Sequence, residues 1–266
     1  MLFSQGAQPS FEQKEKKKAG SKKNPFANQS VAQLKESKEK AIAAKDLASA
    51  AKYLDAMRIA STDQEVIKDI LLEMADIYFE LQEWVKAEKA YNEFILLYPG
   101  AVRFEYAYDK AIACGLKLTL DFDRDQTKTQ EVLKLANEFI AVHPTSEFKD
   151  HVQEMADQCH QRLLESDIGI FKFYLKSNKL KAAQIRLDTI GKEHIPFLPD
   201  YKPQSIELRI ELAQAKNDTA DQLRAQIELA TLFPENDITK RWVTDIAEIK
   251  TQLASLEKET SDHAST

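Results

Sequence analysis

The sequence is poor in the residues that form tight turns, with only 6 Gly and 8 Pro among 266 residues. This scarcity disfavours an all-β sandwich and a nucleotide-binding sheet with glycine-rich loops. The two cysteines, Cys114 and Cys159, are too few for a disulfide framework. We expect both to be buried free thiols, with one bridge between packed helices as the alternative. The longest apolar runs, such as residues 94–98, are about five residues long, whereas a membrane-spanning helix needs ~20.

Neither sign of charge is in large excess, because 37 Lys and Arg face 43 Asp and Glu, which gives a net charge of −6. This acidic balance disfavours nucleic acid as the main partner. Residues 1–30 differ, since they hold six Lys and two Glu and carry a charge of +4. We expect them to form a disordered basic leader, which is either a solvated tail or a tether to anionic lipid headgroups. Residues 257–266 are polar, and we expect a disordered tail there.

Motifs of catalysis and cofactor binding are also missing. The sequence has no GxSxG, P-loop, HExxH or glycine-rich phosphate loop. Of the five His, only His151 and His160 share a predicted helix, where nine residues place them about 13.5 Å apart along the axis. That separation is too large for one metal ion. We therefore predict no metal site, no cofactor and no enzymatic activity.

What the sequence does contain is an internal repeat. The segments NEFILLYP (residues 92–99) and NEFIAVHP (residues 137–144) share five of eight residues and lie 45 positions apart. Each is the end of an amphipathic helix that a proline stops, and residues 231–234 (TLFP) repeat this ending. Repeats of this length are typical of helical solenoids.

The segment before Pro99 matches the tetratricopeptide motif. The small, aromatic and proline positions of that motif are taken by Ala75, Tyr78, Ala87, Tyr91 and Pro99, with Leu71 where tryptophan is usual. The two alanines allow two antiparallel helices to approach closely, and the tyrosines fill the space around them. We place the tight turn between these helices near residues 82–83.

The same periodicity extends along the chain and predicts an all-α fold. We expect an α-solenoid of about five tetratricopeptide-like helix pairs plus a C-terminal capping helix, over residues 31–256. Besides the two helices of the motif on either side of residues 82–83, the predicted helices span residues 31–44, 47–60, 102–118, 129–142, 148–176, 179–190, 205–216, 219–233 and 237–256. In the capping helix, Trp242, Ile246 and Ile249 are expected to cover the end of the stack.

Two stretches carry a more specific resemblance. The first is DFDRDQ (residues 121–126), followed by a helix that ends in HPTSEF (residues 143–148). The second is the series Arg162-Leu163, Asp167, FYLK (residues 173–176), Ala182-Ala183 and Arg186. From about residue 31 to residue 236, the chain resembles the BamD family of outer-membrane assembly lipoproteins, also called YfiO or ComL.

That resemblance implies a non-catalytic scaffold on the periplasmic face of the outer membrane. Its expected partners are the barrel subunit of the β-barrel assembly machinery, accessory lipoproteins and segments of unfolded barrel proteins. Family members carry a secretory signal that ends in a lipidated cysteine, whereas the first cysteine here is Cys114, within a predicted helix. Either the anchor lies upstream of Met1, or this relative works without one. The segment 191–203 is longer than the family's usual link before the last pair.

The resemblance also directs attention to particular residues. It places substrate contact in an N-terminal groove near Tyr78, Tyr106, Lys110 and Arg124. Tyr106 and Lys110 are four residues apart and share a helix face, which suits an extended peptide, although repeat filling explains a tyrosine there equally well. Arg124 either binds a peptide carboxylate or holds its own connection through Arg–carboxylate hydrogen bonds beside a helix N-cap at residue 127 or 129.

The C-terminal repeats are the expected contact with the barrel subunit, between Arg186 and Trp242. Trp84 at a predicted turn is either a cover over helix ends or an exposed binding residue. The main alternative function is a cytoplasmic tetratricopeptide adaptor or secretion chaperone that binds a peptide. A periplasmic coordinator of cell division is disfavoured because residues 12–23 have no heptad pattern.

Overall fold

The structure is a computed structural model that describes residue 26 and residues 29–264. Within these residues it contains helices and turns but no strand. It divides into two compact units, residues 1–73 and 74–266, and helix α3 (Gln64–Glu80) crosses the boundary between them. The predicted basic leader falls almost wholly outside the described residues. In the described part, no helix is long and apolar enough to span a membrane.

The first unit contains one helix pair, α1 (Val31–Ala43) and α2 (Leu47–Ala60), and the start of α3. Ser30 caps α1, because its hydroxyl accepts from the backbone N–H of Gln33 and the Gln33 side chain accepts from the N–H of Ser30. Lys38 of α1 is buried, and its Nζ donates to Oε1 of Glu73 at 2.7 Å. This charged bond joins α3 to α1 within the unit.

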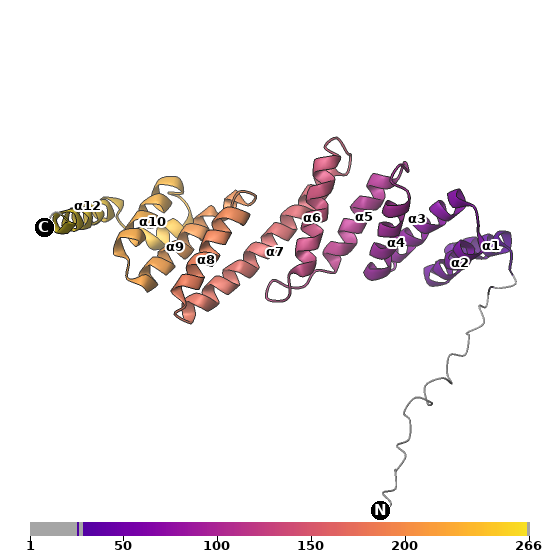
Figure 1. The fold of residues 1–266 in the computed structure, drawn as a ribbon, viewed down its shortest axis with the longest axis horizontal. Helices are drawn as coiled ribbons and strands as arrows, with labels where there is room; N and C mark the ends of the chain where they lie inside the picture. The colour runs from indigo at the N-terminus through magenta and orange to yellow at the C-terminus, as the bar shows by residue number, and fades with distance from the viewer. Residues whose placement is uncertain (1–25, 27–28, 265–266) are drawn as a thin grey trace, which may run out of the picture. The chain divides into compact units, whose positions relative to one another are not determined.

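The second unit contains the rest of α3, followed by α4 (Trp84–Leu97), α5 (Phe104–Lys117), α6 (Thr127–Val142), α7 (Lys149–Lys176), α8 (Leu180–Thr189), α9 (Lys202–Lys216) and α10 (Thr219–Leu232). In Figure 1, these helices follow one another in chain order, each against its neighbours. With α1/α2 and α3/α4, the described residues therefore form five helix pairs. The predicted all-α tetratricopeptide-like architecture is confirmed.

The turns within four of these pairs share one backbone conformation. A single residue in the left-handed conformation joins the two helices: Lys45 (φ 59°), Gln82 (φ 57°), Asn178 (φ 55°) or Asn217 (φ 56°). Asparagine tolerates this conformation better than most residues, whereas lysine and glutamine adopt it less readily. The turn predicted near residues 82–83 is confirmed.

Small residues set the spacing of the helices, and aromatic residues fill the space between them. Ala75, Ala87 and Tyr91 of the repeat motif are fully buried. In the next repeat, Phe139 centres a cluster of α5, α6 and α7 side chains that includes Cys159. Cys114 and Cys159 are both free and buried, as expected, and burial raises the pKa of the Cys114 thiol to about 12. Both thiols are therefore protonated at neutral pH.

The C-terminal end differs from the prediction in two ways. The expected single helix over residues 237–256 is two helices, α11 (Asp237–Trp242) and α12 (Ile246–Ala264). Asp245 causes the break, because its carboxylate accepts from the backbone N–H groups of Ala247 and Glu248 and so starts a new helix. Helix α12 runs on to Ala264, beyond the predicted end at residue 256, since the sequence there holds no Gly or Pro to stop it.

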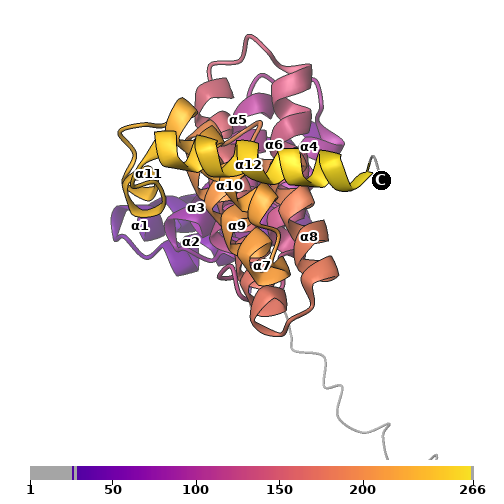
Figure 2. The same ribbon diagram turned by 90° about the vertical axis from the view of Figure 1, so that its left-hand side faces the viewer.

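The capping role of this end is seen in its packing. Figure 2 shows α12 lying across α10, which it contacts. Ile249 is buried, and Trp242 packs on the cluster formed by α9 and α10. Helix α9 begins at Lys202, three residues earlier than expected, because Pro203 falls in its first turn, where a missing N–H costs no hydrogen bond.

Candidate functional site

The first candidate site is built around Asp76 on α3. Its Oδ1 accepts from the hydroxyls of Tyr91 at 2.6 Å and Tyr106 at 2.9 Å, and its Oδ2 lies 3.4 Å from Nη2 of Arg103. The guanidinium of Arg103 also stacks over the Tyr106 ring at 4.2 Å. One carboxylate thus fixes aromatic side chains from α4 and α5.

The tyrosines of this cluster stay protonated, and each donates its hydroxyl hydrogen to Asp76. Burial, and secondarily the hydrogen bond to Asp76, raises the pKa of Tyr106 to about 12. The pKa of Tyr91 is raised further for the same reasons, since this side chain is fully buried. The half-buried ring of Tyr106 is consequently held in one orientation at neutral pH.

Lys110 joins the same cluster, as its spacing from Tyr106 predicts. Its Nζ lies 5.5 Å from the Tyr106 ring centroid and 5.3 Å from that of Phe79. It also lies 3.6 Å from Oδ2 of Asp109, whose side chain is only 1% exposed. Asp109 in turn accepts from Nδ1 of His151 on α7 at 2.5 Å. Lys110 therefore balances a buried carboxylate as well as offering a cation beside two rings.

Tyr78 and Trp84 lie against other partners. The ammonium of Lys86 sits 5.3 Å from the Tyr78 ring centroid. Trp84 packs edge-on against Phe79, with 5.3 Å between the ring centroids, so it covers the end of the α3/α4 pair. The structure thus brings Tyr106 and Lys110 together, with the Lys110 ammonium 5.5 Å from the centroid of the Tyr106 ring.

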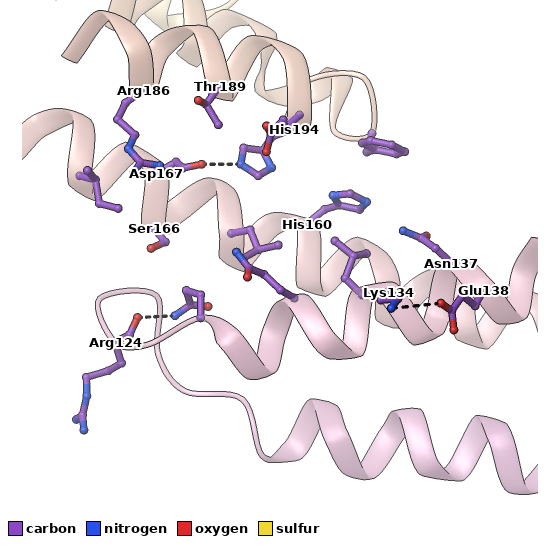
Figure 3. A pocket seen from close by; sticks show the side chains of 17 residues that line it. Arg124, Lys134, Asn137, Glu138, His160, Ser166, Asp167, Arg186, Thr189 and His194 are labelled. Carbon is purple, nitrogen blue, oxygen red and sulfur yellow. Dashed lines mark hydrogen bonds and ion pairs between the residues drawn. The ribbon is translucent and has the colours of Figure 1, made fainter. Parts of the chain in front are cut away.

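Arg124 lies in a second region, the connection between α5 and α6. Asp125 and Gln126 hold this connection: Asp125 accepts from the Thr127 backbone N–H at 3.0 Å, and the Gln126 amide donates to the carbonyl of Asp121 at 2.7 Å. The N-cap predicted at residue 127 or 129 is wrong, because α6 begins at Thr127 and its N-cap is Gln126, whose side chain forms no capping bond. Asp125 bonds to Thr127 and not to Arg124. In Figure 3, the Arg124 guanidinium extends away from the other labelled side chains.

Arg124 instead borders a pocket of about 810 Å³ that α6, α7 and α8 line. Figure 3 shows Asp167 of this pocket between Arg186 and His194. Asp167 accepts from Nη1 of Arg186 at 2.8 Å and from Nε2 of His194 at 2.9 Å, and its side chain is 14% exposed. Arg186 therefore faces the same pocket as Arg124, although the sequence assigned the two residues to different functions.

Trp242, the other predicted partner contact, forms hydrogen bonds within the protein. Its indole N–H donates to Oε1 of Glu207 at 2.9 Å, and its backbone carbonyl accepts from the Gln226 amide at 2.7 Å. Arg241 beside it is 63% exposed and lies 3.1 Å from the same glutamate oxygen. The exposed group at this position is therefore Arg241, while Trp242 mainly anchors α11 to α9 and α10.

Sequence reasoning missed Asp76 and both histidines of the pocket. Asp76 follows the motif alanine directly, so its position suggested only a solvated helix face. His194 sits in a π-helical turn (Ile190–His194), and nothing in a single sequence marks such a turn. In the described residues, no group of three or more His, Cys, Asp or Glu side chains is placed to hold a metal ion.

Comparison with known proteins gives one family match. The model of the YfiO family, described as outer membrane lipoprotein, matches residues 27–211. Among curated proteins, outer membrane protein assembly factor BamD of Caulobacter vibrioides is 26% identical over 103 residues, which is 39% of this chain and 34% of that protein. The matched stretch therefore spans about a third of the relative's length.

Solved structures of repeat proteins are more distant. A tetratricopeptide repeat protein from Parabacteroides merdae is 13% identical, with a TM-score of 0.35 over 85% of this chain and 98% of that one. PilW, a type IV pilus biogenesis factor, is also 13% identical, with a TM-score of 0.31 over 82% of this chain and 100% of its own.

Proposed function

Because this chain belongs to the YfiO family of outer membrane lipoproteins, we propose that it acts in the assembly of outer-membrane β-barrel proteins. The observation that carries this proposal is the family match over residues 27–211, which includes both the Asp76 cluster and the pocket at Arg186. In this role the chain is a non-catalytic scaffold at the periplasmic face of the outer membrane. Its membrane attachment is a lipid anchor or the basic leader.

The substrate in this proposal is an unfolded segment of a barrel protein. Tyr106 and Lys110 support it, because an oriented ring beside an ammonium whose side chain is 26% exposed offers an apolar surface and a cation to an extended peptide. Tyr78 and Arg124 are further proposed contacts. Asp76 contributes indirectly, since it holds the ring of Tyr106 in place.

The barrel subunit and accessory lipoproteins are the proposed partners of the C-terminal repeats. Arg186 supports this assignment, because its guanidinium remains 37% exposed while it is anchored to Asp167. Trp242 lies beyond the residues that the family model matches, so support for it comes only from its neighbour Arg241, which is exposed. We therefore propose Arg186 and Arg241 as the groups that meet the partner, with Trp242 as the support of Arg241.

Depletion of the protein in its own cells tests the general role. We expect folded β-barrel proteins of the outer membrane to decline, while inner-membrane proteins keep their level. Expression of the intact chain from a plasmid should restore the barrel proteins. Unchanged barrel proteins after depletion would contradict the proposal and favour the cytoplasmic adaptor.

Peptide binding tests the substrate site. Replacing Lys110 and Arg124 with alanine should weaken binding of a labelled peptide from a barrel-protein strand by about tenfold, as the loss of two partly exposed charged contacts would give. The matched control is Lys117→Ala with Lys250→Ala, which removes the same charge from exposed positions. Equal weakening in both variants would show a nonspecific charge effect, and collapse of helicity in the first variant would show that its residues are structural.

A further inference from the structure

Two histidines attach the turn after α8 to helix α7. His194 ends the π-helical turn, and its Nε2 lies 2.9 Å from Oδ2 of Asp167 on α7. Three residues later, the ring of Phe197 stacks on His160 of α7, with the centroids 4.2 Å apart and the planes at 13°. His160 is 5% exposed and His194 is 4% exposed, whereas Phe197 is 54% exposed. Residues 190–197 are therefore held to α7 by this hydrogen bond and this ring stack, together with Ile190 and Ile195, which pack in an apolar cluster with α7 side chains.

Each of these imidazoles has one nitrogen without a partner. Nδ1 of His160 and Nδ1 of His194 are buried and form no hydrogen bond within the described residues. A neutral imidazole can carry a lone pair on such a nitrogen, but an imidazolium carries an N–H on both nitrogens. A buried N–H without an acceptor is strongly unfavourable. A protonated His160 ring is therefore stable only if its Nδ1–H finds an acceptor or reaches water.

The charges around His160 come from every element that borders the pocket. Asp157 on α7 favours the imidazolium of His160, and His194 opposes it. The other charged groups that line the pocket are Lys134 and Glu138 on α6, Arg124 in the connection before α6, Asp167 on α7, Arg186 on α8 and Glu193 in the π-helical turn. Asp167 is already bound to Arg186 and His194, so it is not free to accept from His160.

We propose that His160 is a proton sensor, and that its protonation releases Phe197 and loosens residues 190–197 from α7, which opens the pocket beside Arg186. Figure 3 shows His160 and His194 facing this pocket. The proton comes from solvent and no covalent bond changes. Because Arg186 belongs to the proposed partner surface, an effect on partner binding rests on the proposed function, whereas the loosening itself does not.

The direction of the pH effect follows from the burial of His160. Burial, and then the nearby His194, lowers the pKa of His160 from its ordinary value of 6.5. The unfolded or opened segment therefore takes up the proton before the closed one does. The closed state is fully favoured above about pH 6.5 and is lost progressively as the pH falls below that value.

Hydrogen exchange of the full chain, read by mass spectrometry at pH 7.5 and pH 5.5, tests the proposal. After correction for the intrinsic exchange rate, protection of residues 190–197 should be lower at pH 5.5 than at pH 7.5, because the opened segment takes up a proton that the closed one excludes. Protection of α6 should not change. Equal protection of residues 190–197 at both pH values would overturn the proposal.

Two variants separate the sensor from other titrating groups. His160→Phe keeps an aromatic ring against Phe197 but binds no proton, so residues 190–197 should stay protected at pH 5.5. His143→Gln, at the end of α6, is the matched control and should respond as the wild type does. A pH-dependent loss that persists in His160→Phe would refute the sensor.

A measurement on the wild type keeps the proposal testable even if His160→Phe does not fold. In NMR spectra, the ring signals of Phe197 should shift over the same pH range in which His160 titrates. Titration of His160 without any change at Phe197 would overturn the proposed release.

Discussion

Truncation of Asp76 should destabilise the second unit by an amount that the structure sets. In Asp76→Ala, the hydroxyl of the fully buried Tyr91 loses its acceptor, which costs about 1–3 kcal/mol. Tyr106 is half-buried and can turn its hydroxyl to water, and Arg103 is 52% exposed, so both add little. We therefore expect a loss of about 2 kcal/mol in the free energy of unfolding.

The assay is urea unfolding followed by tryptophan fluorescence in a Trp242→Phe background. The chain has two tryptophans, and the remaining one, Trp84, lies 5.3 Å from the ring of Phe79 and so reports on the α3/α4 pair. Asp76→Ala should lower the urea midpoint by about 1 M, with circular dichroism at 222 nm following the same transition.

A double-mutant comparison shows whether the buried hydroxyl is the cause. In a Tyr91→Phe background the hydroxyl is already absent, so Asp76→Ala should cost only about 0.5 kcal/mol there. If Asp76→Ala costs the same in both backgrounds, or less than about 0.5 kcal/mol in the parent, the assignment of Asp76 as the organiser of this cluster is wrong.

Three further substitutions test other contacts. Gly115→Ala should lower stability by about 1–3 kcal/mol in thermal unfolding, because its Cβ would lie 2.7 Å from a valine methyl of α6, whereas Gly191→Ala meets nothing within 4 Å and should be nearly neutral. Trp242→Ala should cost about 3 kcal/mol and increase hydrogen exchange of α11, since it removes both packing and the indole hydrogen bond. Lys38→Ala should destabilise the first unit by about 1 kcal/mol, measured by hydrogen exchange of α1. The double variant Lys38→Ala/Glu73→Ala should lose no more stability than Lys38→Ala alone.

The repeat architecture could be predicted because its determinants are local. Ala75 and Ala87 mark helix contacts, and Pro99 and Pro144 end their helices wherever they occur. The break before α12 was readable in principle, because Asp245 precedes an amphipathic segment as an N-cap does. The apolar residues Trp242, Ile246 and Ile249 lie at helical spacing, and this pattern led to the prediction of one uninterrupted helix.

The polar contacts could not be predicted, since they join residues far apart in the sequence. Asp76 meets Tyr106 across 30 positions, and His194 meets Asp167 across 27. Arg186 was singled out from a pattern of residues, but its pairing with a buried carboxylate depends on how α8 packs on α7. Arg124 and Arg186 likewise border one pocket because of how the helices around it pack, which the spacing of residues in the sequence does not predict.

The most direct test of the central claim is to tag the chromosomal gene, separate the cell fractions and identify by mass spectrometry the proteins that co-purify with the chain. Our account predicts recovery in the outer-membrane fraction together with a large β-barrel subunit, and reduced recovery of that subunit with Arg186→Ala. Recovery in the cytosol without any outer-membrane protein would contradict a role in outer-membrane assembly.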